Sequence, residues 1–145
     1  MAQTVEKTAK ISAAPERVLE VLADFESYPD WQASIVSAEV KARDSQGRPT
    51  QVALGTAAMG MTVNALLDVT HGDGTLSYSL NEPGELLTQQ DVNYVATANA
   101  AGGTDLRLTM VLDVKLKLPD FMVKQLVTKG VNDNIKGAKK IAEKS

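Results

Sequence analysis

The sequence holds few residues of the kinds that carry covalent or metal chemistry. It has a single histidine, His71, and no cysteine. His71 precedes Gly72 in a stretch typical of a turn, so we expect an exposed side chain and no catalytic residue. One exposed imidazole does not support a Ser–His–Asp triad, although lysine-based schemes stay open. No HExxH, GxGxxG or phosphate-loop motif is present, and we predict neither a metal nor a cofactor.

Phenol and amide side chains in apolar surroundings are the remaining candidates for polar contacts with a bound molecule. Tyr78 and Tyr94 each stand in an alternating, largely apolar stretch, and Asn134 falls inside the apolar arc of a helical pattern. Two interpretations stay open for each residue. Its polar tip is satisfied by solvent or by the protein, or it faces an internal cavity.

The C-terminal stretch predicts the element that positions these groups. From Pro119 to Lys144, apolar residues recur at spacings of three and four, as along one face of a helix. They are Val123, Val127, Val131, Ile135, Ala138 and Ala142. Gly130 and Gly137 lie in the helix interior, where each costs about 1 kcal/mol relative to alanine. We therefore expect a bulky group to approach the helix beside these glycines.

The rest of the chain alternates apolar and polar residues, which is the pattern of half-buried strands. The predicted order is one strand, two short helices, six strands and the long helix. Strands are expected at 5–11, 35–43, 51–58, 62–70, 76–80, 86–98 and 106–114. In the second, Val36, Ala38 and Val40 are expected to share a face. Short loops between the later strands indicate an antiparallel meander, and the long helix is the large apolar partner available to cover it.

Composition is that of an ordinary globular protein. With 145 residues, of which 43% are hydrophobic and 23% charged, we expect one domain over 1–145, as a monomer or weak dimer. The net charge of −3 disfavours nucleic-acid binding. The N-terminus lacks the apolar core of a signal peptide, and no apolar run is long enough to span a bilayer. We therefore expect a cytoplasmic protein.

The order of elements resembles the START-like (SRPBCC) superfamily, and most closely its polyketide cyclase/dehydrase and coenzyme-Q-binding branch. Two motifs carry the resemblance, Asp24-Phe25-Glu26-Ser27-Tyr28-Pro29-Asp30-Trp31 and Leu118-Pro119-Asp120-Phe121-Met122-Val123. The resemblance implies an α+β helix-grip fold, in which a seven-stranded antiparallel sheet wraps around the long C-terminal helix and encloses a cavity. Members carry lipids, quinones, sterols or polyketides. A minority are enzymes, and one bacterial branch acts on ribosomes.

Given that fold, side-chain parity assigns the cavity wall. The residues expected to contact a ligand are Val63, Ala65, Leu67, Leu76, Tyr78, Val92, Tyr94, Leu108, Met110, Val127, Val131 and Asn134. Inward aliphatic side chains more often fill a core than line a pocket, so the pattern alone leaves both outcomes open.

Antiparallel connectivity brings the tip near residue 60, the turn at 82–84 and the start of the last helix to one end of the sheet. We expect a portal there, formed by Met59, Met61, Leu118, Phe121 and Met122. Methionines suit adaptable apolar contact, and nearby lysines suit a transient contact with an anionic membrane. The same residues could instead simply cap the core.

The function predicted from these observations is binding of a hydrophobic small molecule, such as a lipid, quinone or polyketide, for storage, shielding or transport. An enzyme is the alternative, a polyketide cyclase or aromatase that assists loss of water through Tyr78 and Tyr94. A protein-interaction module, as in the ribosome-directed branch, is a third possibility that the acidic net charge disfavours.

Overall fold

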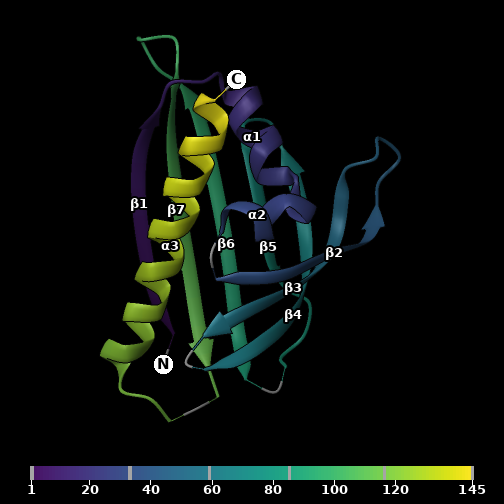
Figure 1. Cartoon of the computed structure of the whole chain (residues 1–145), viewed down its shortest axis with the longest axis vertical. Helices are drawn as coiled ribbons and strands as arrows, with labels where there is room; N and C mark the ends of the chain where they lie inside the picture. Colours follow the sequence, from purple (N-terminus) through teal and green to yellow (C-terminus); the bar gives the residue numbers. More distant parts are fainter. Residues whose placement is uncertain (1, 33, 59, 85, 116, 145) are drawn as a thin grey trace.

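A curved antiparallel sheet grips one long helix in this computed structural model, which describes residues 2–32, 34–58, 60–84, 86–115 and 117–144. Within those residues the sheet has seven strands, and short helical segments follow the first strand (Figure 1). The predicted helix-grip architecture is confirmed.

The strands occur close to their predicted positions. They are β1 (Gln3–Ile11), β2 (Ile35–Arg43), β3 (Pro49–Ala58), β4 (Met61–Gly72), β5 (Thr75–Leu80), β6 (Leu87–Ala98) and β7 (Thr104–Val114). The helical segments are α1 (Pro15–Ala23), the 3-10 turn η1 (Phe25–Ser27), α2 (Tyr28–Trp31) and α3 (Asp120–Glu143). The sheet order is β1-β7-β6-β5-β4-β3-β2, so the first strand pairs with the last and β2 forms the far edge.

Helix α3 covers one side of the sheet with its apolar stripe. All six residues predicted for that stripe are buried. The helix contacts β1, β7 and α1, and in Figure 1 it runs lengthwise in front of β1 and β7. No helix in the described part of the chain is long and apolar enough to cross a membrane.

Trp31 is the bulky group that approaches α3. A Cβ atom added at Gly137 would lie 2.2 Å from Trp31 Cε3 and 3.0 Å from the Trp31 carbonyl oxygen. Only glycine therefore lets α2 pack this closely on α3. At Gly130 an added Cβ would lie 3.6 Å from the sulfur of Met110, which is an ordinary contact. The expected close approach exists at Gly137, and the expectation for Gly130 is wrong.

Strand β2 departs from its predicted alternation because it begins with a bulge. The pairing of β2 with β3 changes register between Ile35 and Ser37. This irregularity leaves Val36 on the outer surface, 53% exposed, whereas Ile35 packs against the core. The prediction that Val36 shares a face with Ala38 and Val40 is therefore wrong.

Strand β4 extends two residues beyond its predicted end. His71 pairs with Leu76 and Gly72 with Thr75, so the turn consists of the two residues after Gly72. His71 is partly buried, and its Nε2 lies 2.6 Å from the carbonyl oxygen of Pro49. The prediction of an exposed histidine within a turn is wrong, because ladder pairing continues through it.

Candidate functional site

A cavity of about 290 Å³ lies between α3 and the inner face of the sheet. It is partly open to solvent, and its described wall comes from α2, the segment before β2, strands β2 to β7 and α3. Most of this wall is apolar, including Ile35, Leu54, Val63, Ala65, Met110 and Leu112. The volume approaches the range of roughly 300–1,000 Å³ that small-molecule pockets occupy.

Five residues predicted for the cavity wall do line it, namely Val63, Ala65, Tyr78, Met110 and Asn134. Their contact with a ligand stays a prediction. The other seven lie in the packed core and not on the described wall: Leu67, Leu76, Val92, Tyr94, Leu108, Val127 and Val131. The alternation of side chains along the strands turned them inward, but there they pack on one another in the core, and α1 also packs on β5 and β6.

Sequence reasoning missed the part of the wall that α2 and the strands after it supply. Tyr28, Gln32, Ile35 and Leu54 all line the cavity. Strands β2 and β3 reach the cavity because the sheet curves across the end of α2, as Figure 1 shows. The motif around Tyr28 carried the resemblance to a fold family, but its residues gave no separate signal of a place in the wall.

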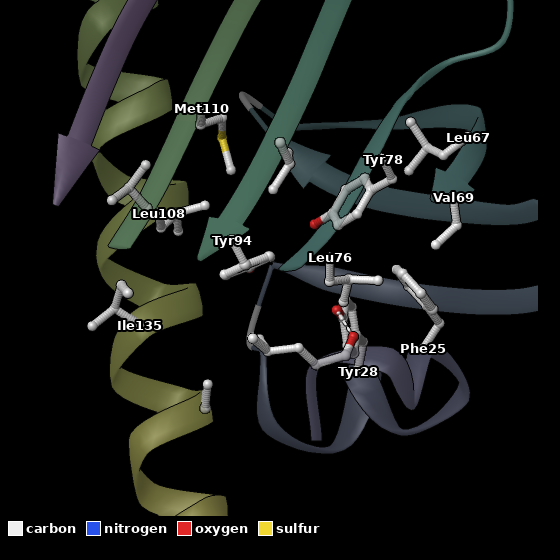
Figure 2. Packing of buried hydrophobic residues seen from close by; sticks show 14 of the residues in the cluster. Phe25, Tyr28, Leu67, Val69, Leu76, Tyr78, Tyr94, Leu108, Met110 and Ile135 are labelled. Carbon is white, nitrogen blue, oxygen red and sulfur yellow. Dashed lines mark hydrogen bonds between the residues drawn. The ribbon is translucent and has the colours of Figure 1, made fainter. Parts of the chain in front are cut away.

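Three polar residues from separate elements form a hydrogen-bonded cluster beside the cavity. Nδ2 of Asn134 donates to the hydroxyl oxygen of Tyr94 at 3.0 Å. The hydroxyl of Tyr78 is hydrogen-bonded to both residues. In Figure 2 the side chains of Tyr78 and Tyr94 project from the strands into the space beside α3. Both interpretations of Asn134 therefore apply, because its amide is satisfied by the protein while the residue also lines the cavity.

The buried tyrosines are held in their protonated form. Burial raises the pKa of Tyr78 and of Tyr94, because a phenolate would lose its hydration there, and this outweighs hydrogen bonding from Asn134, which lowers both pKa values. Burial likewise raises the pKa of Tyr28, whose hydroxyl donates to the carbonyl of Leu22. At neutral pH these groups can donate hydrogen bonds, but none of them is a base.

Gln32 places an unpaired polar group in the wall. The residue is 2% exposed, and its Nε2 has no hydrogen-bond partner in the described part of the chain. Its backbone N–H bonds the carbonyl oxygen of Tyr28 at 2.8 Å, which fixes the residue at the end of α2. The Nε2 atom is therefore buried and unpaired, on a residue whose backbone is held in place.

The predicted portal residues do not form a single group. Met61 and Leu118 line the cavity, and Met61 is 40% exposed. Phe121, 64% exposed, lies instead in a shallow groove on the outer side of α3 with Lys124. Met122 is half-buried and does not belong to the described wall. Met59 lies outside the described residues.

Charged groups contribute little to the cavity. Among the described wall residues Lys129 alone is charged at neutral pH, and its Nζ is paired with Asp133 at 2.9 Å. Within the same described ranges, no group of three or more histidine or acidic side chains is arranged to hold a metal ion. The geometry suits enclosure of an apolar molecule with hydrogen bonds at a few points.

A family profile described as polyketide cyclase/dehydrase and lipid transport matches residues 2–143. Among solved structures, a START superfamily protein from Mycobacterium smegmatis is 26% identical, with a TM-score of 0.87 and 97% of each chain covered. TTHA0849 from Thermus thermophilus is 23% identical, with a TM-score of 0.81, over 99% of this chain and 100% of that chain. The Zhui aromatase/cyclase from a Streptomyces species is 20% identical, with a TM-score of 0.79, over 99% of this chain and 94% of that chain. No curated protein matched the sequence.

Proposed function

Because the chain belongs to the polyketide cyclase/dehydrase and lipid transport family, we propose that it binds a hydrophobic small molecule between the sheet and α3. The observation that carries the proposal is the cavity of about 290 Å³ with its largely apolar wall. The comparisons do not single out the coenzyme-Q-binding branch, so a quinone is one ligand class beside lipids and polyketides. The protein would store, shield or transport its ligand.

The apolar wall supplies the affinity. Removal of apolar surface from water contributes about 25 cal/mol per Å², so a ligand that buries roughly 250 Å² gains on the order of 6 kcal/mol before the costs of association. The small side chain of Ala65 and the absence of one at Gly130 leave the space that such a ligand needs. Met110 adds a flexible thioether that adapts to different ligand shapes.

A polyketide cyclase or aromatase activity is the alternative. The cluster of Tyr78, Tyr94 and Asn134 favours it, because phenol hydroxyls can polarise a ligand carbonyl by donating hydrogen bonds. Because both tyrosines have a raised pKa, neither can serve as the base of such a mechanism. The largely apolar wall favours binding without turnover. Turnover of an aromatic polyketide that is lost in Tyr78→Phe would establish the enzyme instead.

Filling the cavity from α3 should weaken ligand binding. In Gly130→Leu the new side chain projects from the cavity wall toward Met110 and occupies space that a ligand would take. We expect the affinity for anilinonaphthalene sulfonate, an apolar fluorescent probe, to fall at least about tenfold, equivalent to about 1.4 kcal/mol. A fluorescence titration of the purified protein measures this change.

The matched control places the same residue on the exposed side of the same helix. Gln125→Leu adds a leucine to α3 outside the cavity and should leave the affinity for the probe unchanged. Thermal unfolding of both variants shows that each is folded. Binding by Gly130→Leu as tight as that of the unmodified protein would place the probe elsewhere and contradict the proposal.

A further inference from the structure

The side-chain amide of Gln32 has no evident structural purpose. It is buried on the cavity wall, and its Nε2 is unpaired among the described residues. A buried donor without an acceptor destabilises the folded state, and an apolar side chain of similar shape would avoid that cost. The amide is therefore a candidate for contact with a molecule that enters the cavity.

The buried tyrosines and Asn134 differ from Gln32 because each already has a hydrogen-bond partner. Tyr78, Tyr94 and Asn134 are hydrogen-bonded to one another. The hydroxyl of Tyr28 donates to a backbone carbonyl in α1. Oγ1 of Thr88 is also buried without a partner, but this residue does not belong to the described cavity wall. Among the described wall residues, Nε2 of Gln32 is the buried side-chain donor without a partner.

The packing of α2 on α3 decides which end of the cavity this donor occupies. Trp31 lies against Gly137, one helical turn beyond Asn134, and Gln32 follows directly after Trp31. In Figure 1, α2 lies beside the middle of α3, whereas the start of β4 and the start of α3 lie at the lower end. Met61, the first residue of β4, lines the cavity at that lower end. Gln32 therefore belongs to the α2 end of the cavity.

We propose that Gln32 donates a hydrogen bond to an oxygen atom of the bound molecule and so orients an otherwise apolar ligand with that oxygen toward α2. This inference rests on the proposed function and narrows it. The ligand class is a hydrophobic molecule with a ketone, quinone or phenolic oxygen. A plain hydrocarbon would fill the same space but would leave the amide unpaired.

Two rigid probes of equal shape test the inference. Fluorenone and fluorene share one tricyclic skeleton, and the carbonyl of the first replaces a methylene group of the second. Displacement of anilinonaphthalene sulfonate measures the affinity of each. We expect the protein to prefer fluorenone by about tenfold, the effect of one hydrogen bond to a buried group that otherwise lacks a partner.

The variant Gln32→Met replaces the amide with an apolar side chain of similar length. In this variant we expect the preference for fluorenone to disappear while fluorene binds as before. The thermal stability of the ligand-free variant should equal or exceed that of the unmodified protein, because an unpaired buried amide has been removed. An unchanged preference for fluorenone in Gln32→Met would overturn the inference.

Infrared spectroscopy of the unmodified protein gives a readout that needs no variant. The carbonyl stretch of bound fluorenone should shift to lower frequency, as it does on hydrogen bonding, and a frequency equal to that in a hydrocarbon solvent would overturn the inference. Equal binding of fluorenone and fluorene would overturn it too, while the proposed function stands. Binding of neither probe would instead contradict the proposed function.

Discussion

Above about pH 10, where an exposed tyrosine ionises, the protein should lose stability steeply. The chain has three tyrosines, Tyr28, Tyr78 and Tyr94, and all three are buried with a raised pKa in the folded state. Above the unfolded pKa the unfolded chain releases phenol protons that the folded protein still holds, so stability falls as the pH rises. Below that pH the tyrosines contribute no pH dependence.

The expected slope is large for a domain of this size. Each tyrosine contributes about 1.4 kcal/mol per pH unit, and three together contribute about 4 kcal/mol per unit, against a typical total stability of about 5–15 kcal/mol. Urea unfolding at a series of alkaline pH values measures the slope, and phenolate absorbance reports the ionisation. Tyr78→Phe removes one phenol, keeps every lysine and should reduce the slope by about a third.

The outcome that would contradict this account is simple ionisation in the native protein. If phenolate absorbance rose near pH 10, the pKa of an exposed tyrosine, without loss of native structure, the tyrosines would be accessible to water. The enclosed interior that they line would then be absent.

Gly137→Ala should destabilise the protein although alanine is the better helix former. The new methyl group would lie 2.2 Å from the ring of Trp31 and 3.0 Å from its carbonyl oxygen, so relief requires movement of the backbone of α2. We expect overpacking strain at the upper end of about 1–3 kcal/mol, which exceeds the gain of about 1 kcal/mol in helix propensity. Urea unfolding gives the net change. Displacement of α2 should also weaken ligand binding, because Gln32 directly follows α2.

The second interior glycine of α3 provides the control. In Gly130→Ala the added methyl group meets Met110 at 3.6 Å, an ordinary contact. This variant should gain up to about 1 kcal/mol from helix propensity. The same substitution in one helix should thus have opposite signs at the two sites. Equal effects would mean that Trp31 does not restrain α3.

The sequence predicted those parts of the fold that depend on local periodicity. The buried stripe of α3 from Val123 to Ala142 follows from spacing alone, and the strands follow from alternation. The bulge between Ile35 and Ser37 was not predictable, because pairing with β3 produces it and the sequence of β2 still alternates. The end of β4 at Gly72 was missed because pairing with β5 carries the strand beyond its predicted end.

The cavity was predictable in position but not in extent. The alternation of side chains along each strand identifies inward residues such as Tyr78 and Met110. It does not show where α1 and α2 fill the interior. That depends on helix packing, including the contact between Trp31 and Gly137. Nothing in the sequence marked Gln32 as a residue of the cavity wall, because a polar residue after a short helix is common. Its burial without a partner appears only in three dimensions.

The most direct test of binding between the sheet and α3 is nuclear magnetic resonance of the methionine methyl groups during addition of fluorenone. Met110 lines the cavity, whereas Met122 is not part of its described wall. We predict that the methyl resonance of Met110 shifts until the ligand saturates the protein, while that of Met122 stays in place. A ligand that binds without moving the Met110 resonance would lie outside the cavity and contradict the account.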